Sequence, residues 1–412
     1  MEVKHGLGYQ NYEDMMRNQI FYIDKTDFIK EWWNYADKVT LITRPRRFGK
    51  TLNMSTIECF FSRRYEGRGD LFAGRKVWED EALRALQGTY PVIFMTFAGV
   101  KSGYVGGERE ETKHKNVEAV KTAVKQIISD TYTKYRNIMQ SGKFDDSDRE
   151  FFASVKDNMT DKTAQMAVRR LCSYLERYYE RKVIVLLDEY DTPMQEAWFC
   201  GYWEEAVAFF KGFFVKTFKD NESMERGLIT GITRISKESI FSELNHLKVV
   251  TTTSDKYGTC FGFTEEEVFK ALDDAGLGEH KSGVKKWYDG FTFGKYTDIY
   301  NPWSIISFIE NHAKYEAYWA NTSSNDLVSR LIQTGDADVK KTVEDLLAGK
   351  SFTAPIDEQI VFSQLNGNTN AIWSLLLASG YLKTTGREPL REDRTDDAQY
   401  TLTLTNREVW FL

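Results

Sequence analysis

Short apolar runs alternate with longer segments of helical spacing along the first 255 residues. Four of these runs have the length and β-branched content of strands that are buried on both faces, and they lie at 39–43, 91–97, 183–187 and 228–232. Between the runs, apolar residues recur every three or four positions, as they do on the buried face of a helix. Strands that alternate with helices predict an α/β fold with a parallel, doubly wound sheet.

The pattern changes after residue 255, where we place a domain boundary. Thr264 and Glu267 have the spacing of a capping box and predict the start of a helix. Asn301 before Pro302 predicts another helix start, and the spacing over 302–381 is mostly helical. We therefore expect a core domain at 1–255 and a mainly helical C-terminal region at 256–412.

Two polar segments are expected at the surface. The stretch 101–116 is polar and rich in glycine, which predicts a loop. Near the C-terminus, a helix at 372–379 precedes two candidate strands, 381–384 and 400–404, with the charged stretch GREPLREDRTDD between them. A helix followed by two strands and a charged turn predicts a winged-helix-like end.

The first strand leads into the most informative stretch of the chain, TRPRRFGKTLNMS at 43–55. A strand, a tight loop that ends in Gly-Lys-Thr and a following helix form the arrangement of a phosphate-binding P-loop. Gly49 lets the backbone approach a phosphate, Lys50 can neutralise the β- and γ-phosphates, and the Thr51 hydroxyl can hold Mg²⁺. Amides at the start of the helix add to the site, assisted by the helix dipole. The pattern predicts a nucleoside triphosphate with Mg²⁺ as the ligand.

The loop departs from the usual P-loop pattern at its first position, where Arg44 stands in place of glycine. An ordinary strand–turn–helix with a basic surface loop is the alternative interpretation. The loop arginines could also contact a nucleic acid, but we favour contact with the triphosphate or a role in fixing the loop. The residues expected to contact the nucleotide are Pro45, Arg46, Arg47, Phe48, Gly49, Lys50, Thr51 and Leu52.

A second motif, VIVLLDEYD at 183–191, consists of the apolar run at 183–187 and the four residues that follow it. Ligands of open α/β sheets bind at the carboxyl ends of the strands, where Asp188 and Glu189 stand. An aspartate there can hold Mg²⁺ through water, as in a Walker B motif, and the adjacent Glu189 can polarise the attacking water as a general base. A solvated acidic turn is the alternative for this segment alone. The two motifs together favour nucleotide binding and hydrolysis.

With these motifs, the chain resembles a bacterial family of predicted AAA-ATPase-like proteins, which often carry a C-terminal PD-(D/E)XK-type nuclease domain. Matching segments run in the family's order along nearly the whole chain. They are YIDKTDFIKEW (22–32), TRPRRFGKTLNMS (43–55), VIVLLDEYDTPM (183–194), GLITGITRISKESIFSELNHLKV (227–249), YGTCFGFTEEEV (257–268), WYDGFTFG (287–294), YNPWSI (300–305), IWSLLLASGYL (372–382) and TNREV (405–409).

The resemblance implies a P-loop ATPase of the ASCE class, in which the catalytic glutamate follows the Walker B aspartate. The family shares the RPRRF loop, so Arg44 is no sign of a lost site. The nuclease-like domain of the family would begin near the end of this sequence. Its active-site residues have no counterpart here, so we assign no nuclease activity. Either the chain is a truncated form or the effector part belongs to another polypeptide.

Three further residues are candidates for the site. In the ASCE class, the strand beside the Walker B strand often presents a polar sensor to the γ-phosphate. Arg234 follows the run at 228–232 and could be that sensor or an arginine finger in cis, or it could start a helix and pair with an acidic neighbour. Asp191 could support the metal shell, although turn capping is favoured. The motif Asp24-Lys25-Thr26, in a segment that matches the family, either lies on the base side of the nucleotide or is a structural anchor.

Composition narrows the class of protein. The net charge is −6, with 42% hydrophobic and 28% charged residues, which is ordinary for a globular protein and excludes a generally basic nucleic-acid surface. The 4 cysteines form no C-x-x-C pair and the 5 histidines lack zinc-site spacing, so we expect neither a disulfide scaffold nor structural zinc. We find no signal pattern and no apolar run long enough to span a membrane, and expect a cytoplasmic protein without membrane contact.

These observations predict an enzyme that hydrolyses ATP with Mg²⁺ to drive a conformational switch. Lys50, Glu189 and Arg234 are the expected catalytic residues, and Thr51 and Asp188 the expected metal ligands. No guanine-binding Asn/Thr-Lys-x-Asp motif is visible, which favours ATP over GTP. We expect the C-terminal region to contact a protein or nucleic-acid partner and to regulate a nucleic-acid-related or defence-type effector. The alternative is a nucleotide-gated binding or scaffold module without significant turnover; the sequence does not define the oligomeric state.

Overall fold

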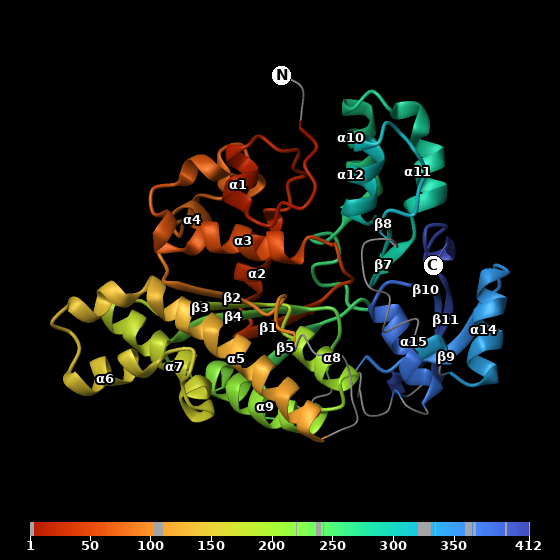
Figure 1. Cartoon of the computed structure of the whole chain (residues 1–412). Coiled ribbons are helices and arrows are strands. Elements are labelled where there is room, and N and C mark those ends of the chain that lie inside the picture. The colour runs from red at the N-terminus through yellow and green to blue at the C-terminus, as the bar shows by residue number, and fades with distance from the viewer. Residues whose placement is uncertain are drawn as a thin grey trace.

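A five-stranded parallel sheet forms the centre of the molecule in this computed structural model (Figure 1). The structure describes residues 4–101, 110–219, 221–235, 240–241, 243–319, 331–333, 335–358, 365, 368–391 and 394–411. In spatial order the strands are β2 (Val92–Thr96), β3 (Val183–Asp188), β4 (Met224–Gly231), β1 (Val39–Thr43) and β5 (Leu247–Val250). Each strand is parallel to its neighbours, which confirms the predicted α/β class. One strand, β4, separates the strands that carry the two motifs.

Helices cover both faces of the sheet, which explains why its central strands are apolar at nearly every position. In β3, Val185 and Leu187 belong to one hydrophobic core cluster, and Ile184 and Leu186 to the other, since successive side chains of a strand point to opposite faces. The first face carries α5 (Glu110–Lys134), α7 (Asp161–Tyr179) and α9 (Trp203–Phe218). The second face carries α2 (Asp27–Tyr35) and α3 (Lys50–Phe61).

The structure differs from the predicted elements at the edges of the core. β4 begins at Met224, four residues before the predicted run. The charged residues Glu225 and Arg226 near its start interrupt the apolar pattern by which the strand was recognised. The four-residue strand β5 was not predicted, since it lies at the sheet edge and is only partly buried. Helix α5 begins at Glu110, so 110–116 is helical rather than loop, and 102–109 lies outside the described residues. The remaining helices of this part are α1 (Tyr12–Arg17), α4 (Glu81–Arg84), α6 (Asp146–Ser154) and α8 (Thr192–Phe199).

The first part of the C-terminal region pairs three helices with a small antiparallel sheet. The helices are α10 (Glu265–Asp274), α11 (Lys281–Tyr288) and α12 (Pro302–Glu310), and the sheet has the order β6 (Phe263–Thr264), β8 (Tyr296–Tyr300), β7 (Phe291–Phe293). The capping box of Thr264 and Glu267 is present, and the Asn301 side chain accepts a hydrogen bond from the Trp303 amide. Both predicted helix starts are therefore confirmed.

The second part joins α14 (Ala337–Leu347) and α15 (Thr369–Ala378) to a sheet with the order β10 (Leu382–Arg391), β11 (Arg394–Leu404), β9 (Phe352–Pro355). The helix and the two following strands occur as predicted, but the strands continue into the charged stretch that was expected to be a turn. Positions 392–393 lie outside the described residues. In this stretch the pairing of the two backbones, from Leu382 with Leu404 to Arg391 with Arg394, defines the strands. The winged-helix assignment stays a prediction.

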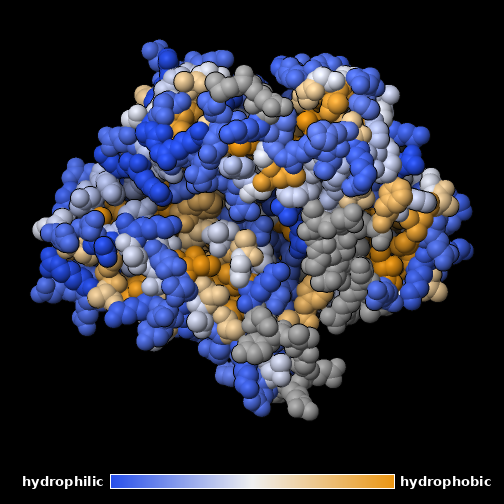
Figure 2. All heavy atoms as spheres, turned by 45° about the horizontal axis from the view of Figure 1, so that its top comes forward, coloured by the Kyte–Doolittle hydropathy of each residue, from blue (hydrophilic) through white to orange (hydrophobic). Residues whose placement is uncertain are grey.

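Within the described part of the chain, no helix is long and apolar enough to cross a membrane. The face shown in Figure 2 is largely hydrophilic, and its exposed apolar side chains form scattered groups rather than one continuous patch. Single exposed apolar groups are normal on folded proteins. The site is therefore to be sought in a cavity.

Candidate nucleotide-binding site

The loop between β1 and α3 has the geometry of an anion site. Gly49 is the N-cap of α3 in the left-handed conformation, with φ 79°, and a Cβ built on it would meet nothing within 4 Å. No side chain caps the helix, so amide groups of its first turn keep their hydrogen-bonding capacity for a ligand. Free amides and the positive end of the helix dipole favour a phosphate group at this position.

The Lys50 ammonium is buried beneath this loop. It donates hydrogen bonds to the carbonyl oxygens of Arg44, at 3.0 Å, and Pro45, at 2.9 Å. Burial lowers the pKa of Lys50, and the carboxylates of Glu189 and Asp188 oppose that shift. A buried cation whose hydrogen bonds within the described residues go to neutral carbonyls is suited to a negatively charged ligand.

The two motifs meet through a hydrogen bond. The Thr51 hydroxyl donates to Asp188 Oδ2 at 2.7 Å, although the residues are 137 positions apart. The other carboxylate oxygen of Asp188 accepts from the Thr230 hydroxyl on β4. Burial raises the pKa of Asp188, and both hydroxyl donors oppose the shift. Thr230 was not predicted as part of the site, although a polar residue in an apolar strand is a usable signal.

The arrangement fits Mg²⁺ bound together with a substrate phosphate. Among the described residues there is no group of three or more His, Cys, Asp or Glu side chains that could form a metal cage. Mg²⁺ usually keeps several waters and binds through one or two protein groups plus phosphates. Thr51 faces the cavity and Asp188 stands directly behind it, so these two residues are the ones that would hold the ion.

Glu189 projects from the turn after β3 and lines the same cavity as Lys50. Its backbone has φ 51°, a left-handed conformation that is uncommon for a residue other than glycine. The Thr192 hydroxyl donates to its carboxylate at 3.3 Å. Strained backbone of this kind clusters at functional sites.

Asp191 fixes the turn rather than facing the cavity. Its Oδ2 accepts hydrogen bonds from the amides of Ile232 and Thr233, from the Thr233 hydroxyl and from Gln195. These bonds join the end of β3 to the segment after β4. The Asp191 side chain makes no capping hydrogen bond to α8, so it links two strand ends rather than capping its own turn.

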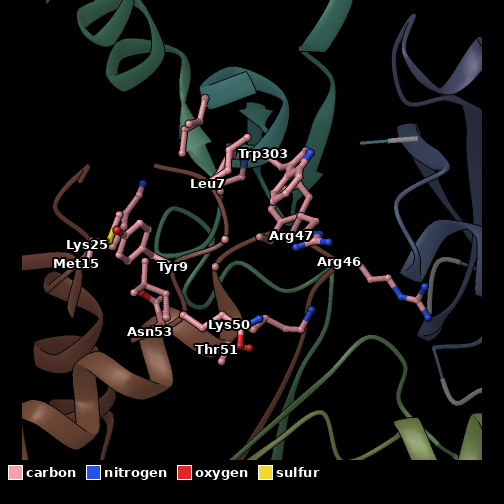
Figure 3. Close-up of a pocket in the computed structure, with 18 of the residues that line it drawn as sticks. Leu7, Tyr9, Met15, Lys25, Arg46, Arg47, Lys50, Thr51, Asn53 and Trp303 are labelled. Atoms are coloured by element: carbon pink, nitrogen blue, oxygen red, sulfur yellow. The ribbon is translucent and has the colours of Figure 1, made fainter. Parts of the chain in front are cut away.

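The cavity has a volume of about 470 Å³, and several parts of the chain line it (Figure 3). They include the P-loop at 46–53, residues 6–10 near the N-terminus, Glu189 after β3, and Phe263, Trp303 and Ile306 of the C-terminal region. The size lies within the range of small-molecule sites. Neither the Gly-rich N-terminal segment nor Trp303 was predicted to line the site.

Arg44 is a buried structural residue. Its guanidinium donates to the carbonyl oxygens of Thr43, Thr251 and Lys256, and lies 4.4 Å from the centre of the Phe293 ring. Burial lowers its pKa to about 10. These contacts explain how the loop is held without the usual first glycine.

The next four loop residues face different surroundings. Arg47 lies beside Trp303, whereas Arg46 extends away from the loop (Figure 3). Phe48 is buried against the Phe291 ring, with 4.7 Å between the centroids. Pro45 does not line the cavity and packs against Gly380.

Two candidates from the sequence lie apart from the phosphate end. Arg234 lines a separate cavity of about 70 Å³ with Phe241 and Leu244, and the structure does not bring it together with Lys50. Lys25 lines the large cavity but donates to Glu267 at 2.6 Å and to the Thr259 carbonyl at 2.8 Å. It thereby joins the N-terminal segment to the C-terminal region.

Two features define the P-loop ATPase class. The parallel sheet has one strand between the Walker A and Walker B strands. The Gly-Lys-Thr loop is hydrogen-bonded to the Walker B aspartate. The model of the family described as Predicted AAA-ATPase matches residues 6–241, and the chain belongs to this family.

The chain is also similar to two other proteins. It is 24% identical over 311 residues to an uncharacterized protein in the vnfD 5′ region of Azotobacter chroococcum mcd 1, which covers 74% of this chain and 51% of that protein. This chain therefore spans about half the length of the curated relative. The solved structure of the Walker-type ATPase PABY2304 of Pyrococcus abyssi is similar with a TM-score of 0.42 and 13% identity, over 99% of this chain and 98% of that one.

Proposed function

We propose that this protein hydrolyses ATP with Mg²⁺ by in-line attack of water on the γ-phosphate. The observation that carries the proposal is the hydrogen bond between Thr51 and Asp188, which supports a role for these two residues as a metal-binding pair next to Lys50. Lys50 and the loop amides stabilise charge on the phosphates, Thr51 and Asp188 hold Mg²⁺, and Glu189 orients the water. Pro45 and Arg234 take no part in this assignment, because neither lines the cavity.

In this proposal, ATP turnover drives a conformational switch. Residues 44–48 all contact the C-terminal region or the segment that leads to it, so a change of state in the loop reaches that region directly. We propose that the region thereby regulates a nucleic-acid-related or defence-type effector through a protein or nucleic-acid partner.

The test is phosphate release from ATP with and without Mg²⁺. Lys50→Ala is expected to lose nucleotide binding, and Glu189→Gln to keep binding while turnover falls about 100-fold or more, as for removal of a general base. Glu205→Gln, an exposed change of the same chemistry on α9, is the matched control and leaves turnover unchanged. Turnover that survives in both site variants would exclude the proposed catalytic site.

The second candidate function is a nucleotide-gated binding module. The packing of the loop against the C-terminal region favours it, because that contact can signal occupancy without turnover. Tight ATP binding without phosphate release, even with partners present, would support this function over hydrolysis.

A further inference from the structure

Arg47 occupies a position between the catalytic side of the cavity and the C-terminal region. Its guanidinium carbon lies 4.1 Å from the centre of the Trp303 ring (Figure 3). The Glu189 carboxylate lines the same cavity, and its charge opposes the effect of partial burial, which lowers the Arg47 pKa. Arg47 and Trp303 both line the cavity, together with Lys50 and Thr51.

The Arg47 charge has no acidic partner in hydrogen-bonding contact among the residues that the structure describes. It differs in this from Lys25, which is engaged by Glu267 in the same cavity. The backbone of Arg47 is left-handed, with φ 67°, so a bulky residue is held where glycine would be easier to accommodate. An exposed cation, held over an aromatic ring at the rim of a phosphate site, is available to a second anionic group.

Trp303 is well placed to orient this cation. It stands in the first turn of α12, where its amide is fixed by the Asn301 side chain at 2.9 Å. Asn301 also donates to the Arg46 carbonyl oxygen, at 3.3 Å, so the same cap holds both the helix and the loop. The ring is thus tied to the loop residue that precedes Arg47.

We propose that Arg47 supplies the cation that distinguishes a triphosphate from a diphosphate, and that Trp303 of the C-terminal region positions it. The proposal rests on the proposed function, since it assigns the γ-phosphate end of the same site. A charge-assisted bond to phosphate can add to the contact with the aromatic face, so Arg47 can bind a γ-phosphate while it stays over Trp303. The shared contact couples nucleotide state to helix α12.

The experiment measures the affinities of the non-hydrolysable ATP analogue AMP-PNP and of ADP, each with Mg²⁺, by isothermal titration calorimetry. Arg47→Ala is expected to weaken AMP-PNP binding at least about tenfold, with ADP binding nearly unchanged. Trp303→Leu is expected to weaken AMP-PNP binding about threefold or more, and Trp303→Phe to restore it. In the double variant Arg47→Ala/Trp303→Leu, the loss is expected to equal that of Arg47→Ala alone.

The matched control is Trp287→Leu, the same change in α11, where the ring stacks on Phe411 away from the cavity. It should leave the ratio of the two affinities unchanged. Arg47→Lys keeps the charge without the planar group, and is expected to retain part of the preference for AMP-PNP. Thermal unfolding of each variant checks that it folds.

Equal losses for AMP-PNP and ADP in Arg47→Ala and Arg47→Lys would overturn the proposal while leaving the nucleotide site intact. Additive losses in the double variant would overturn the role of Trp303. If the wild-type protein binds neither nucleotide, the proposed function fails as well, so the two failures are distinguishable.

Discussion

Arg44 shows how one side chain can replace the usual geometry of a P-loop. A glycine at this position would give the loop a flexible first turn. Here a fully buried guanidinium instead ties the loop to the carbonyl oxygens of Thr251 and Lys256, beyond the end of β5. The residue is therefore required for the position of the loop, and glycine cannot substitute for it.

We expect Arg44→Gly, which restores the usual pattern, to destabilise the protein by about 3 kcal/mol or more, because buried carbonyl groups lose their donors and a cavity forms. Equilibrium unfolding in urea measures the change. Arg46→Gly, the same substitution at an exposed position two residues away, should stay within about 1 kcal/mol of the wild type. A stability for Arg44→Gly equal to that of Arg46→Gly would contradict this structural role.

The sequence predicted the residues that line the site better than the residues that hold the loop in position. Lys50, Thr51 and Glu189 line one cavity because the spacing of the two motifs encodes their place at the ends of parallel strands. The burial of Arg44 could not be predicted, since its partner carbonyl at Thr251 is 207 positions away and is a backbone group. Trp303 was missed for the same reason: nothing local indicates that α12 faces the loop.

At the scale of elements, β4 contributes to the site although it carries neither motif. It lies between β1 and β3, so a side chain near its end is adjacent to the Walker B aspartate. Thr230 uses this position to donate to Asp188. Groups that orient a metal-binding carboxylate tune the affinity of the metal.

We expect Thr230→Val to raise the Mg²⁺ concentration needed for half-maximal nucleotide binding or turnover by about tenfold or more, because Asp188 loses an orienting donor. The matched control is Thr40→Val on β1, where the hydroxyl is buried and without a hydrogen-bond partner among the described residues. Removing an unsatisfied hydroxyl should be neutral or stabilising. Titrations with Mg²⁺ compare the two variants, and an equal shift in both would argue against the orienting role.

The strands that sequence patterns revealed are those buried on both faces. β1 and β3 are buried at every position, and their bounds match the prediction closely. β5, β7 and β9 are short, mixed in composition and dependent on their neighbours, and their local sequences carry little strand signal. The architecture of the core was therefore predictable, and so in part were β10 and β11, whereas the short strands β5, β7 and β9 were not.

At the scale of the whole molecule, the P-loop is the point where the core and the C-terminal region meet. The Arg46 carbonyl oxygen accepts from Trp319 Nε1 at 3.2 Å, and Phe48 packs against Phe291. Pro45 touches Gly380, where an added Cβ would come within 2.9 Å of the proline ring. A ligand that orders the loop must therefore also affect elements that are distant in sequence.

We expect AMP-PNP with Mg²⁺ to slow amide hydrogen exchange both in the loop at 45–52 and in α12, while α6, at the far end of the molecule in Figure 1, stays unchanged. At a free ligand concentration of about 100 times Kd, binding should stabilise the folded state by about 2.7 kcal/mol, which a rise in Tm reports. Hydrogen exchange followed by mass spectrometry measures the regional effect, and Lys50→Ala serves as the control that binds no nucleotide.

Protection confined to the loop would show that the C-terminal region does not respond to nucleotide, and the contacts of 44–48 would then serve stability alone. Protection that reaches α12 but is lost in Trp303→Leu would identify the Arg47–Trp303 contact as the route of coupling.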